Sequence, residues 1–165
     1  MLSLILLTAS AFTHRIVRAQ EEKQREREVV IVMDCSKSME NVDSQYLAFD
    51  FVKGLAASLP ENCEIGLVTF NNEVCASLPI GSEYTEIEHT LDGLRYRQYG
   101  NAGAGMEAAV ALFGDEQAEK SVLLLSDGEI MMDTDEGTEA SVMAFRQAVA
   151  AAKDRDVEID VLAMG

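Results

Sequence analysis

Cysteine and histidine are scarce in this chain, and their scarcity argues against two classes of site. The three cysteines, Cys35, Cys63 and Cys75, form no Cys-x-x-Cys pair, and no spaced pair of histidines accompanies them. We therefore expect neither a disulfide framework nor a zinc site, but buried thiols. The two histidines, His14 and His89, offer little as general bases, because one lies in the leader and the other on a short predicted helix.

Basic residues are also few. The chain has 13 Lys and Arg against 29 Asp and Glu, which gives a formal net charge of −16. A surface of this charge repels phosphate backbones, so we expect no nucleic-acid partner. The acidic surface is either a solvated face or one that attracts divalent cations.

The apolar run at the amino end is too short to cross a bilayer, and we expect no integral membrane span. The run, Met1 to Phe12, suits the apolar region of a secretory signal, and small-residue cleavage patterns end at Ala11 and Ala19. We expect a signal peptide over residues 1–19, a charged linker over residues 20–28, and an extracellular or cell-surface location. An ordinary N-terminal helix is the alternative.

The composition is that of a globular α/β protein, with 48% hydrophobic and 25% charged residues. Apolar runs predict strands, and apolar residues three or four positions apart predict helices. The expected strands cover residues 29–33, 64–70, 73–79, 120–126 and 157–164, and the expected helices cover residues 45–59, 85–94, 106–113 and 138–156. Asn71-Asn72 suits a tight hairpin turn, so strand 73–79 should run antiparallel to its predecessor. The glycines of loop 99–105 do not match G-x-G-x-x-G, so a dinucleotide site is not expected.

Oxygen-bearing side chains follow the first predicted strand. Asp34, Ser36 and Ser38 are two residues apart and point to one side of an extended chain. If the loop curls, a carboxylate and two hydroxyls meet at one point, which suits a hard cation such as Mg²⁺. A serine-rich turn that caps the next helix through Asp34 or Ser38 is the alternative.

A second apolar run that ends in aspartate favours the metal site. Lys120 to Ser126 leads directly into Asp127, and parallel strands release such carboxylates at the same edge of a sheet. The acidic loop at residues 129–139 does not have the EF-hand spacing, so we expect it to form a solvated rim.

With these residues placed, the chain resembles the von Willebrand factor type A (VWA) domain family over residues 28–165. Three motifs occur in the family's order: Asp34-Cys-Ser-Lys-Ser-Met39, Ile65-Gly-Leu-Val-Thr-Phe70 and Leu123-Leu-Leu-Ser-Asp-Gly128. The resemblance implies an α/β fold with a Rossmann-like, doubly wound sheet, mostly parallel with one antiparallel strand, and helices on both faces. It also implies a metal-ion-dependent adhesion site (MIDAS) that takes Mg²⁺, or Mn²⁺ or Ca²⁺ in its place, on Asp34, Ser36, Ser38 and Asp127.

The chain departs from the family pattern in two respects. Aligning residues 107–110 with the usual Gly-x-Ala-Leu start of the central helix puts Ala104 where the family has a Thr ligand. We therefore expect weakened or altered metal binding, which Asn101 could compensate only if the loop were shifted. Domains of this family also continue through another helix and strand, so we expect a domain truncated before them, whose strand 157–164 shows an apolar edge and an uncovered face.

The function that these residues favour is protein binding, not catalysis. A Mg²⁺ on two carboxylates and two hydroxyls keeps an open position for an acidic residue of a partner protein, in adhesion or complex assembly. One alternative is a structural or interaction VWA domain with a degenerate metal site. Another is a Mg²⁺-dependent phosphohydrolase with Asp34 as nucleophile and Asp127 on the metal. Against it, such enzymes want a second Asp where this chain has Ser36, and we find no well-placed Lys as a phosphate partner.

Overall fold

A computed structural model of the chain describes residues 26–114 and 117–165. The predicted signal peptide and most of the predicted linker lie outside these residues. The described part contains the strands β1 (Arg27–Asp34), β2 (Cys63–Phe70), β3 (Val74–Leu78), β4 (Glu119–Ser126) and β5 (Val157–Ala163), and the helices α2 (Met39–Val42), α3 (Leu47–Ser58), α4 (Tyr84–Asp92), α5 (Ala102–Leu112) and α6 (Asp135–Asp154).

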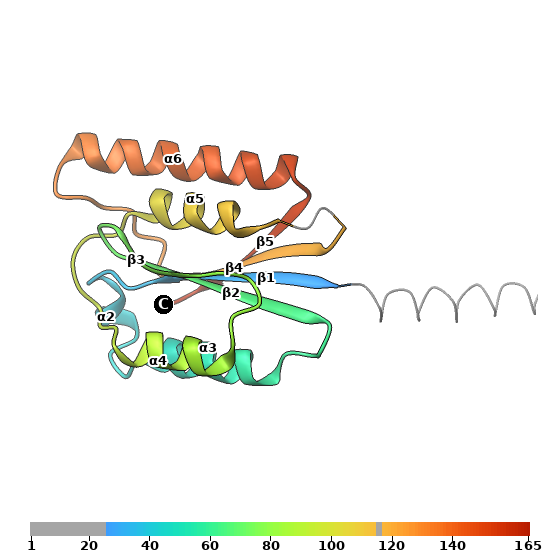
Figure 1. Ribbon diagram of the computed structural model, residues 1–165. Helices are drawn as coiled ribbons and strands as arrows, with labels where there is room; N and C mark the ends of the chain where they lie inside the picture. Colours follow the sequence, from blue (N-terminus) through green and yellow to red (C-terminus); the bar gives the residue numbers. More distant parts are fainter. Residues whose placement is uncertain (1–25, 115–116) are drawn as a thin grey trace, which may run out of the picture.

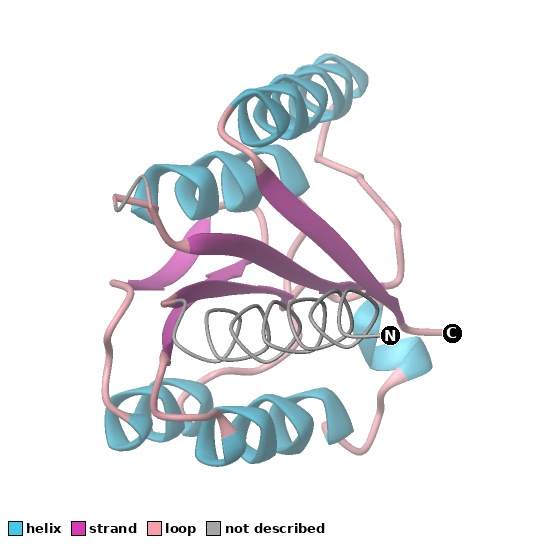
Figure 2. Cartoon of the chain, turned by 90° about the vertical axis from the view of Figure 1, so that its right-hand side faces the viewer, coloured by secondary structure: helices cyan, strands magenta, loops and turns pink. Residues whose placement is uncertain are grey.

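The strands form one sheet in the order β3-β2-β1-β4-β5, in which β3 alone is antiparallel to its neighbour. Helices α3 and α4 lie on one side of the sheet and α5 and α6 on the other (Figures 1 and 2). This three-layer arrangement confirms the predicted doubly wound, mostly parallel fold. Strand β1 begins at Arg27, so it includes the last two residues that the sequence assigned to the linker.

The central strand β1 is hydrophobic from Val29 to Met33 because helices cover both of its faces (Figure 1). Val30 and Val32 pack into the cluster under α5 and α6, whereas Ile31 and Met33 pack into the cluster under α3 and α4. All four side chains are fully buried. A parallel strand buried on both faces cannot alternate apolar with polar residues, which explains the continuous run from Val29 to Met33.

Helix α5 begins earlier than the sequence predicted. The glycine-containing segment expected as a loop up to Gly105 is helical from Ala102. Its glycines are needed for close packing: a Cβ on Gly103 would lie 2.5 Å from the carbonyl oxygen of Ser141, and one on Gly105 would lie 2.5 Å from the Phe70 ring. The prediction placed these glycines in a loop, whereas Gly103 and Gly105 lie inside the helix at contacts that leave no room for a Cβ.

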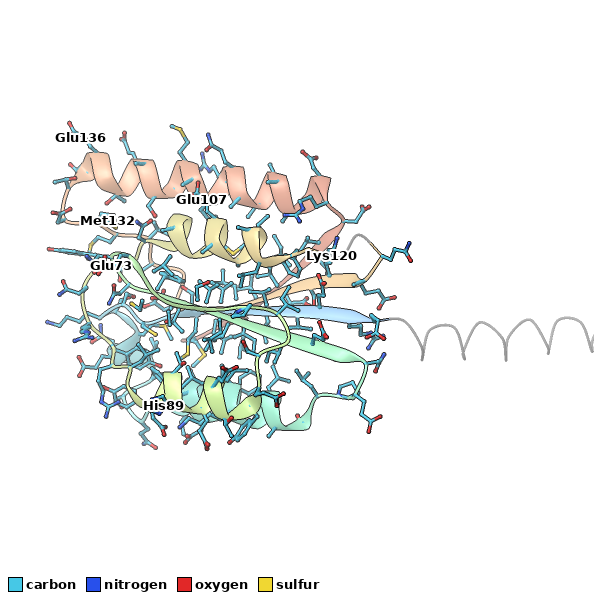
Figure 3. The ribbon with its side chains drawn as sticks, viewed as in Figure 1. Glu73, His89, Glu107, Lys120, Met132 and Glu136 are labelled. Carbon is cyan, nitrogen blue, oxygen red and sulfur yellow. The ribbon has the colours of Figure 1, made fainter. Side chains whose placement is uncertain are left out.

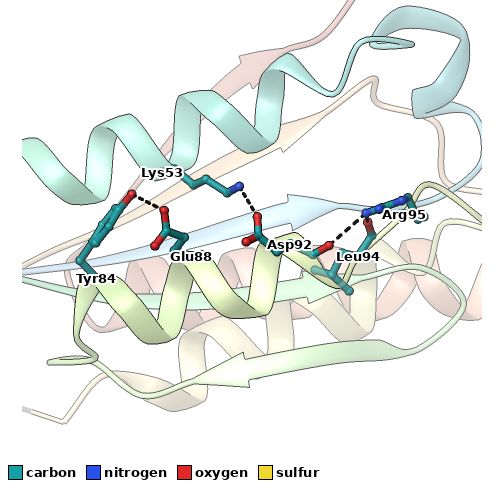
Figure 4. A network of polar contacts seen from close by, with 6 residues as sticks. All are labelled: Lys53, Tyr84, Glu88, Asp92, Leu94 and Arg95. Carbon is teal, nitrogen blue, oxygen red and sulfur yellow. Dashed lines mark hydrogen bonds and ion pairs between the residues drawn. The ribbon is translucent and has the colours of Figure 1, made fainter.

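Helices α3 and α4 are joined by a polar network on their outer side (Figure 4). Lys53 on α3 forms an ion pair with Asp92 at the end of α4. The guanidinium of Arg95 donates a hydrogen bond to the backbone oxygen of Asp92 at 3.1 Å and another to that of Leu94. Arg95 is therefore engaged at the carboxyl end of α4, where the chain leaves for the functional edge of the sheet.

The three cysteines are free thiols, and only Cys35 is buried. The expectation of buried thiols is wrong for Cys75, which is exposed beside a register shift in the pairing of β3 with β2. Such an irregularity changes which side chains face the core, and the sequence pattern of a short edge strand does not reveal it.

Strand β5 lies at the edge of the sheet and is only partly covered. Val161 is 62% exposed and Leu162 is 37% exposed, in agreement with the expected uncovered face. Within residues 26–114 and 117–165, no helix is long and apolar enough to span a membrane.

Candidate metal centre

The candidate site lies at the carboxyl edge of the two central strands. Strands β1 and β4 pair in parallel with Met33 opposite Leu125, so Asp34 and Asp127 leave the sheet at the same edge. The hydroxyl of Ser126 donates a hydrogen bond of 2.8 Å to Oδ2 of Asp34 and so joins the two strand ends. The structure thus brings together the two aspartates that the sequence singled out, 93 positions apart in the chain numbering.

Asp34 is the buried acid of this edge, with no exposed surface. Its Oδ1 accepts a hydrogen bond of 2.9 Å from the backbone N–H of Ser36. Burial raises the pKa of Asp34, hydrogen bonds from Ser36 and Ser126 oppose the rise, and the nearby charge of Asp127 adds to it. A carboxylate held in this way gains from a positive charge beside it, because a cation compensates both the burial and the repulsion.

The hydroxyls of Ser36 and Ser38 lie 3.0 Å apart, and the loop that carries them curls as expected. Mg²⁺ binds oxygen octahedrally at about 2.1 Å, which places adjacent ligands about 3.0 Å from each other. The two hydroxyls thus have the separation of neighbouring Mg²⁺ ligands. The capping alternative does not fit, because Ser38 precedes α2 without any side-chain capping hydrogen bond and Asp34 bonds to Ser36 instead.

Asp127 follows β4 in a tight turn. Its Oδ1 accepts a hydrogen bond of 2.9 Å from the backbone N–H of Glu129, and the side chain is half-buried. Gly128 adopts a φ of 85°, a conformation that other residues rarely adopt. The turn directs the chain away from the sheet while the carboxylate stays at the strand end.

The loop that carries Ser36 and Ser38, which we call the serine loop (residues 35–38), is hydrogen-bonded to a second segment. We call this second segment the strap (residues 95–101). The N–H of Arg97 donates to the carbonyl of Cys35 at 2.9 Å, and the N–H of Lys37 donates to the carbonyl of Gln98 at 3.0 Å. Gln98 has a φ of 67°, a strained value for a residue with a side chain. A Cβ on Gly100 would lie 3.5 Å from Ser36 Oγ and 3.0 Å from the carbonyl of Glu129, so the strap passes very close to the candidate ligands.

Tyr96 anchors the strap to the base of α3. Its hydroxyl donates a hydrogen bond of 2.6 Å to Asp43, whose carboxylate also accepts hydrogen bonds from the backbone N–H groups of Leu47 and Ala48 at 2.8 and 2.9 Å. The Tyr96 ring stacks on Tyr46 with centroids 4.9 Å apart. Burial, followed by the hydrogen bond to Asp43, raises the pKa of Tyr96.

Asn101, not Ala104, ends the loop before the central helix. The predicted alignment placed Ala104 in that loop, but Ala104 lies in the first turn of α5. Asn101 is the N-cap: its Oδ1 accepts from the N–H of Ala104 at 3.2 Å and from the hydroxyl of Ser141 at 2.8 Å. The side chain at this loop position therefore carries an oxygen, and that oxygen caps α5 and contacts α6.

The other charged residues that the sequence analysis considered do not belong to the candidate site. They lie on its rim or in other parts of the fold. Asp133, Asp135 and Glu136 are exposed, as expected for a solvated rim. Figure 3 shows Glu136 at the amino end of α6, Lys120 at the opposite end of the sheet from Glu73, and His89 on α4. Neither Lys120 nor His89 is thus placed to assist chemistry at Asp34.

The donor set fits a hard divalent cation and little else. Among the described residues, no cluster of three or more His, Cys, Asp and Glu could hold a metal ion. A cation at this edge would therefore need the serine hydroxyls as ligands in addition to the two carboxylates. Neutral oxygen ligands with few carboxylates suit Mg²⁺ or Mn²⁺ better than soft metals.

Sequence reasoning proposed Asp34, Ser36, Ser38 and Asp127 as ligands but missed the residues that hold them in place. Ser126 could have been noticed, because it stands next to Asp127 at the end of a buried strand. No local signal identifies Tyr96, whose partner Asp43 is 53 residues away in sequence.

Known structures share this architecture. An aerotolerance-related membrane protein from Bacteroides fragilis superposes with a TM-score of 0.63 and 25% identity, over 84% of this chain and 68% of that one. The conserved hypothetical protein BatB from Bacteroides thetaiotaomicron gives a TM-score of 0.64 with 23% identity, over 83% of this chain and 66% of that one.

Sequence comparison agrees with the structural comparison. An uncharacterized protein from Borreliella burgdorferi is 32% identical over 114 residues, which cover 64% of this chain and 33% of that protein. The match thus spans about a third of that relative. The model of the von Willebrand factor type A domain matches residues 28–165. The chain therefore belongs to the von Willebrand factor type A domain family.

Proposed function

We propose that this VWA domain binds a divalent cation, with Mg²⁺ the first candidate, through Asp34, Ser36, Ser38 and Asp127. VWA domains are general protein-interaction and adhesion modules. In the proposed role, the cation keeps an open position that takes an acidic residue of a partner protein. The bound cation supplies the positive charge, and the domain holds the oxygen ligands in place.

The observation that carries the proposal is the 3.0 Å separation of the Ser36 and Ser38 hydroxyls, together with the nearby charges of Asp34 and Asp127. Ligands placed before the metal arrives lower the cost of ordering the loop on binding. The strap supports this arrangement through its backbone hydrogen bonds to Cys35 and Lys37.

The buried position of Asp34 argues against the phosphohydrolase alternative. Its carboxylate has no exposed surface, and both of its oxygens accept hydrogen bonds, from Ser36 and from Ser126. A nucleophile must reach its substrate, and this carboxylate lies below the loop. A binding role asks only that it contribute charge and orient the loop.

We further propose a location at the cell surface or outside the cell. The similar protein from Bacteroides fragilis is described as a membrane protein, and the fold also occurs in a type V pilus tip protein from Porphyromonas gingivalis. An adhesion or assembly module with an acidic surface suits such a location.

Titration calorimetry of Mg²⁺, Mn²⁺ and Ca²⁺ into the full chain tests the metal site. We expect binding that Asp34→Ala and Asp127→Ala both abolish. Asp154→Ala is the matched control, because Asp154 is an exposed acid in the last turn of α6. If the folded wild type binds no cation, the proposal is wrong, and the alternative of a structural or metal-independent interaction domain remains.

A further inference from the structure

Two basic side chains flank the serine loop of this strongly acidic protein. Lys37 lies between Ser36 and Ser38 in sequence, and Arg97 is held against the loop by the hydrogen bond from its N–H to the carbonyl of Cys35. Both side chains are exposed. The net charge of −16 makes a basic pair at the candidate metal site unusual for this chain.

Neither side chain is used elsewhere in the described structure. Lys37 and Arg97 take part in no ion pair among residues 26–114 and 117–165, unlike Arg27 and Lys53, which pair with Glu119 and Asp92. The neighbouring Arg95 is also engaged, at the carboxyl end of α4 (Figure 4). The positive charges of Lys37 and Arg97 thus remain available to a partner.

Backbone hydrogen bonds place the two basic residues on neighbouring segments, because the N–H of Lys37 donates to the carbonyl of Gln98, the residue after Arg97. The exposed acids Glu40 and Glu129 belong to other segments of the rim, in α2 and in the turn after β4. A partner segment that contacts this loop can therefore meet both exposed basic side chains.

The strap also presents apolar surface of the kind found at protein interfaces. Tyr99 is 40% exposed and Met131 is 45% exposed, and Gly100 pairs with Met131 through an isolated backbone bridge. Tyr, Met and Arg are enriched where proteins meet, whereas solvated surfaces favour Lys and Glu. This combination suits a protein segment better than a small free acid.

We propose that the partner of this site is a protein segment with several acidic residues, one of which reaches the cation while others pair with Lys37 and Arg97. The inference rests on the proposed metal-dependent function and adds a preference for clustered acidic residues. Exposed ion pairs are individually weak, so the pair should strengthen binding roughly two- to tenfold at low salt. Charges within about 10 Å of each other at 0.1 M salt escape most screening, and added salt should reduce the gain.

The test uses two synthetic peptides, both acetylated and amidated so that no terminal carboxylate competes. One carries a single Glu among Gly and Ser, and the other carries three consecutive Glu in the same background. Binding to the full chain is followed through its backbone amide resonances with saturating Mg²⁺ and again with a chelator. We expect Mg²⁺-dependent binding of both peptides, with the three-Glu peptide bound two- to tenfold more tightly.

The double variant Lys37→Gln/Arg97→Gln should remove this difference without weakening Mg²⁺ binding, because loss of nearby positive charge does not disfavour a cation. The control Arg146→Gln/Lys153→Gln removes two exposed charges from α6 and should keep the difference. If Mg²⁺ and the single-Glu peptide bind but three Glu give no gain, or if the gain survives in Lys37→Gln/Arg97→Gln, the inference is overturned while the metal site stands. Failure of Mg²⁺ itself to bind overturns both.

Discussion

Replacement of Gly103 by Ala tests how closely the two helices above the sheet are packed. Gly103 lies in the first turn of α5, where a Cβ would be 2.5 Å from the carbonyl oxygen of Ser141 and 2.8 Å from the Cβ of Ala144. Both contacts are to α6, and one is to its backbone. The methyl group therefore cannot be accommodated by a change of rotamer, and the helices must separate.

The change in the free energy of unfolding of Gly103→Ala is the difference between two opposing effects. Overpacking a well-packed contact costs about 1 to 3 kcal/mol, whereas Ala is favoured over Gly in a helix by up to about 1 kcal/mol. We expect a net loss of about 1 to 2 kcal/mol in the free energy of unfolding. For a chain of this size, each kcal/mol corresponds to about 2 to 4 °C in Tm, so Tm should fall by about 2 to 8 °C.

Gly54→Ala is the matched control. Gly54 lies in the interior of α3, and a Cβ there meets nothing within 4 Å. This variant gains helix propensity without a clash and should be more stable by about 1 kcal/mol. Urea denaturation followed by circular dichroism measures the free energy of unfolding of both variants. A Gly103→Ala protein as stable as Gly54→Ala would refute the close packing of α5 on α6.

Three further predictions concern the site and its supports. Because burial raises the pKa of Asp34 in the fold, its ionisation destabilises the metal-free domain as pH rises through that pKa, and Mg²⁺ reverses the effect. Mg²⁺ affinity should accordingly fall as pH is lowered through the same range, because Mg²⁺ binding then releases a proton. Calorimetry in two buffers of different ionisation enthalpy measures the number of protons released. A value of zero would contradict this prediction. Tyr96→Phe should cost about 1 to 2 kcal/mol in urea denaturation, because Asp43 loses one of its hydrogen bonds, and an unchanged midpoint would show that the bond contributes nothing. A thiol reagent should label Cys75 quickly in the native protein and Cys35 only on unfolding, as mass spectrometry of peptides can measure; early labelling of Cys35 would be inconsistent with its burial.

The strands and the two aspartates were predictable because their signals are local. A run such as Val29 to Met33 is buried on both faces, and its hydrophobicity is continuous for that reason. The same pattern before Asp127 placed both carboxylates at one edge, since parallel strands share their direction. Asn71-Asn72 predicted the antiparallel hairpin through turn chemistry alone.

The start of α5 and the register of β3 were not predictable in this way. Glycine favours loops, so the sequence predicted a loop at Gly103 and Gly105. In the structure they are helical, and they are glycine because Ser141 and Phe70 approach too closely for any side chain. The early start of the helix also makes Asn101, not Ala104, the residue at the end of the loop. The close contacts of Gly103 and Gly105 are with residues more than 30 positions away in the sequence.

The sequence by itself determined the order of the five strands and the four longer helices, the two buried faces of the central strand, and the oxygen-bearing residues at two strand ends, because periodicity and turn chemistry act over a few residues. Only the tertiary structure decided which of those oxygens meet. The hydrogen bonds from Ser126 to Asp34 and from Tyr96 to Asp43 join distant segments through packing, and they support the loop in which Ser36 and Ser38 lie 3.0 Å apart. Contacts between distant segments arise from the balance of the whole core, and no short stretch of sequence contains that information.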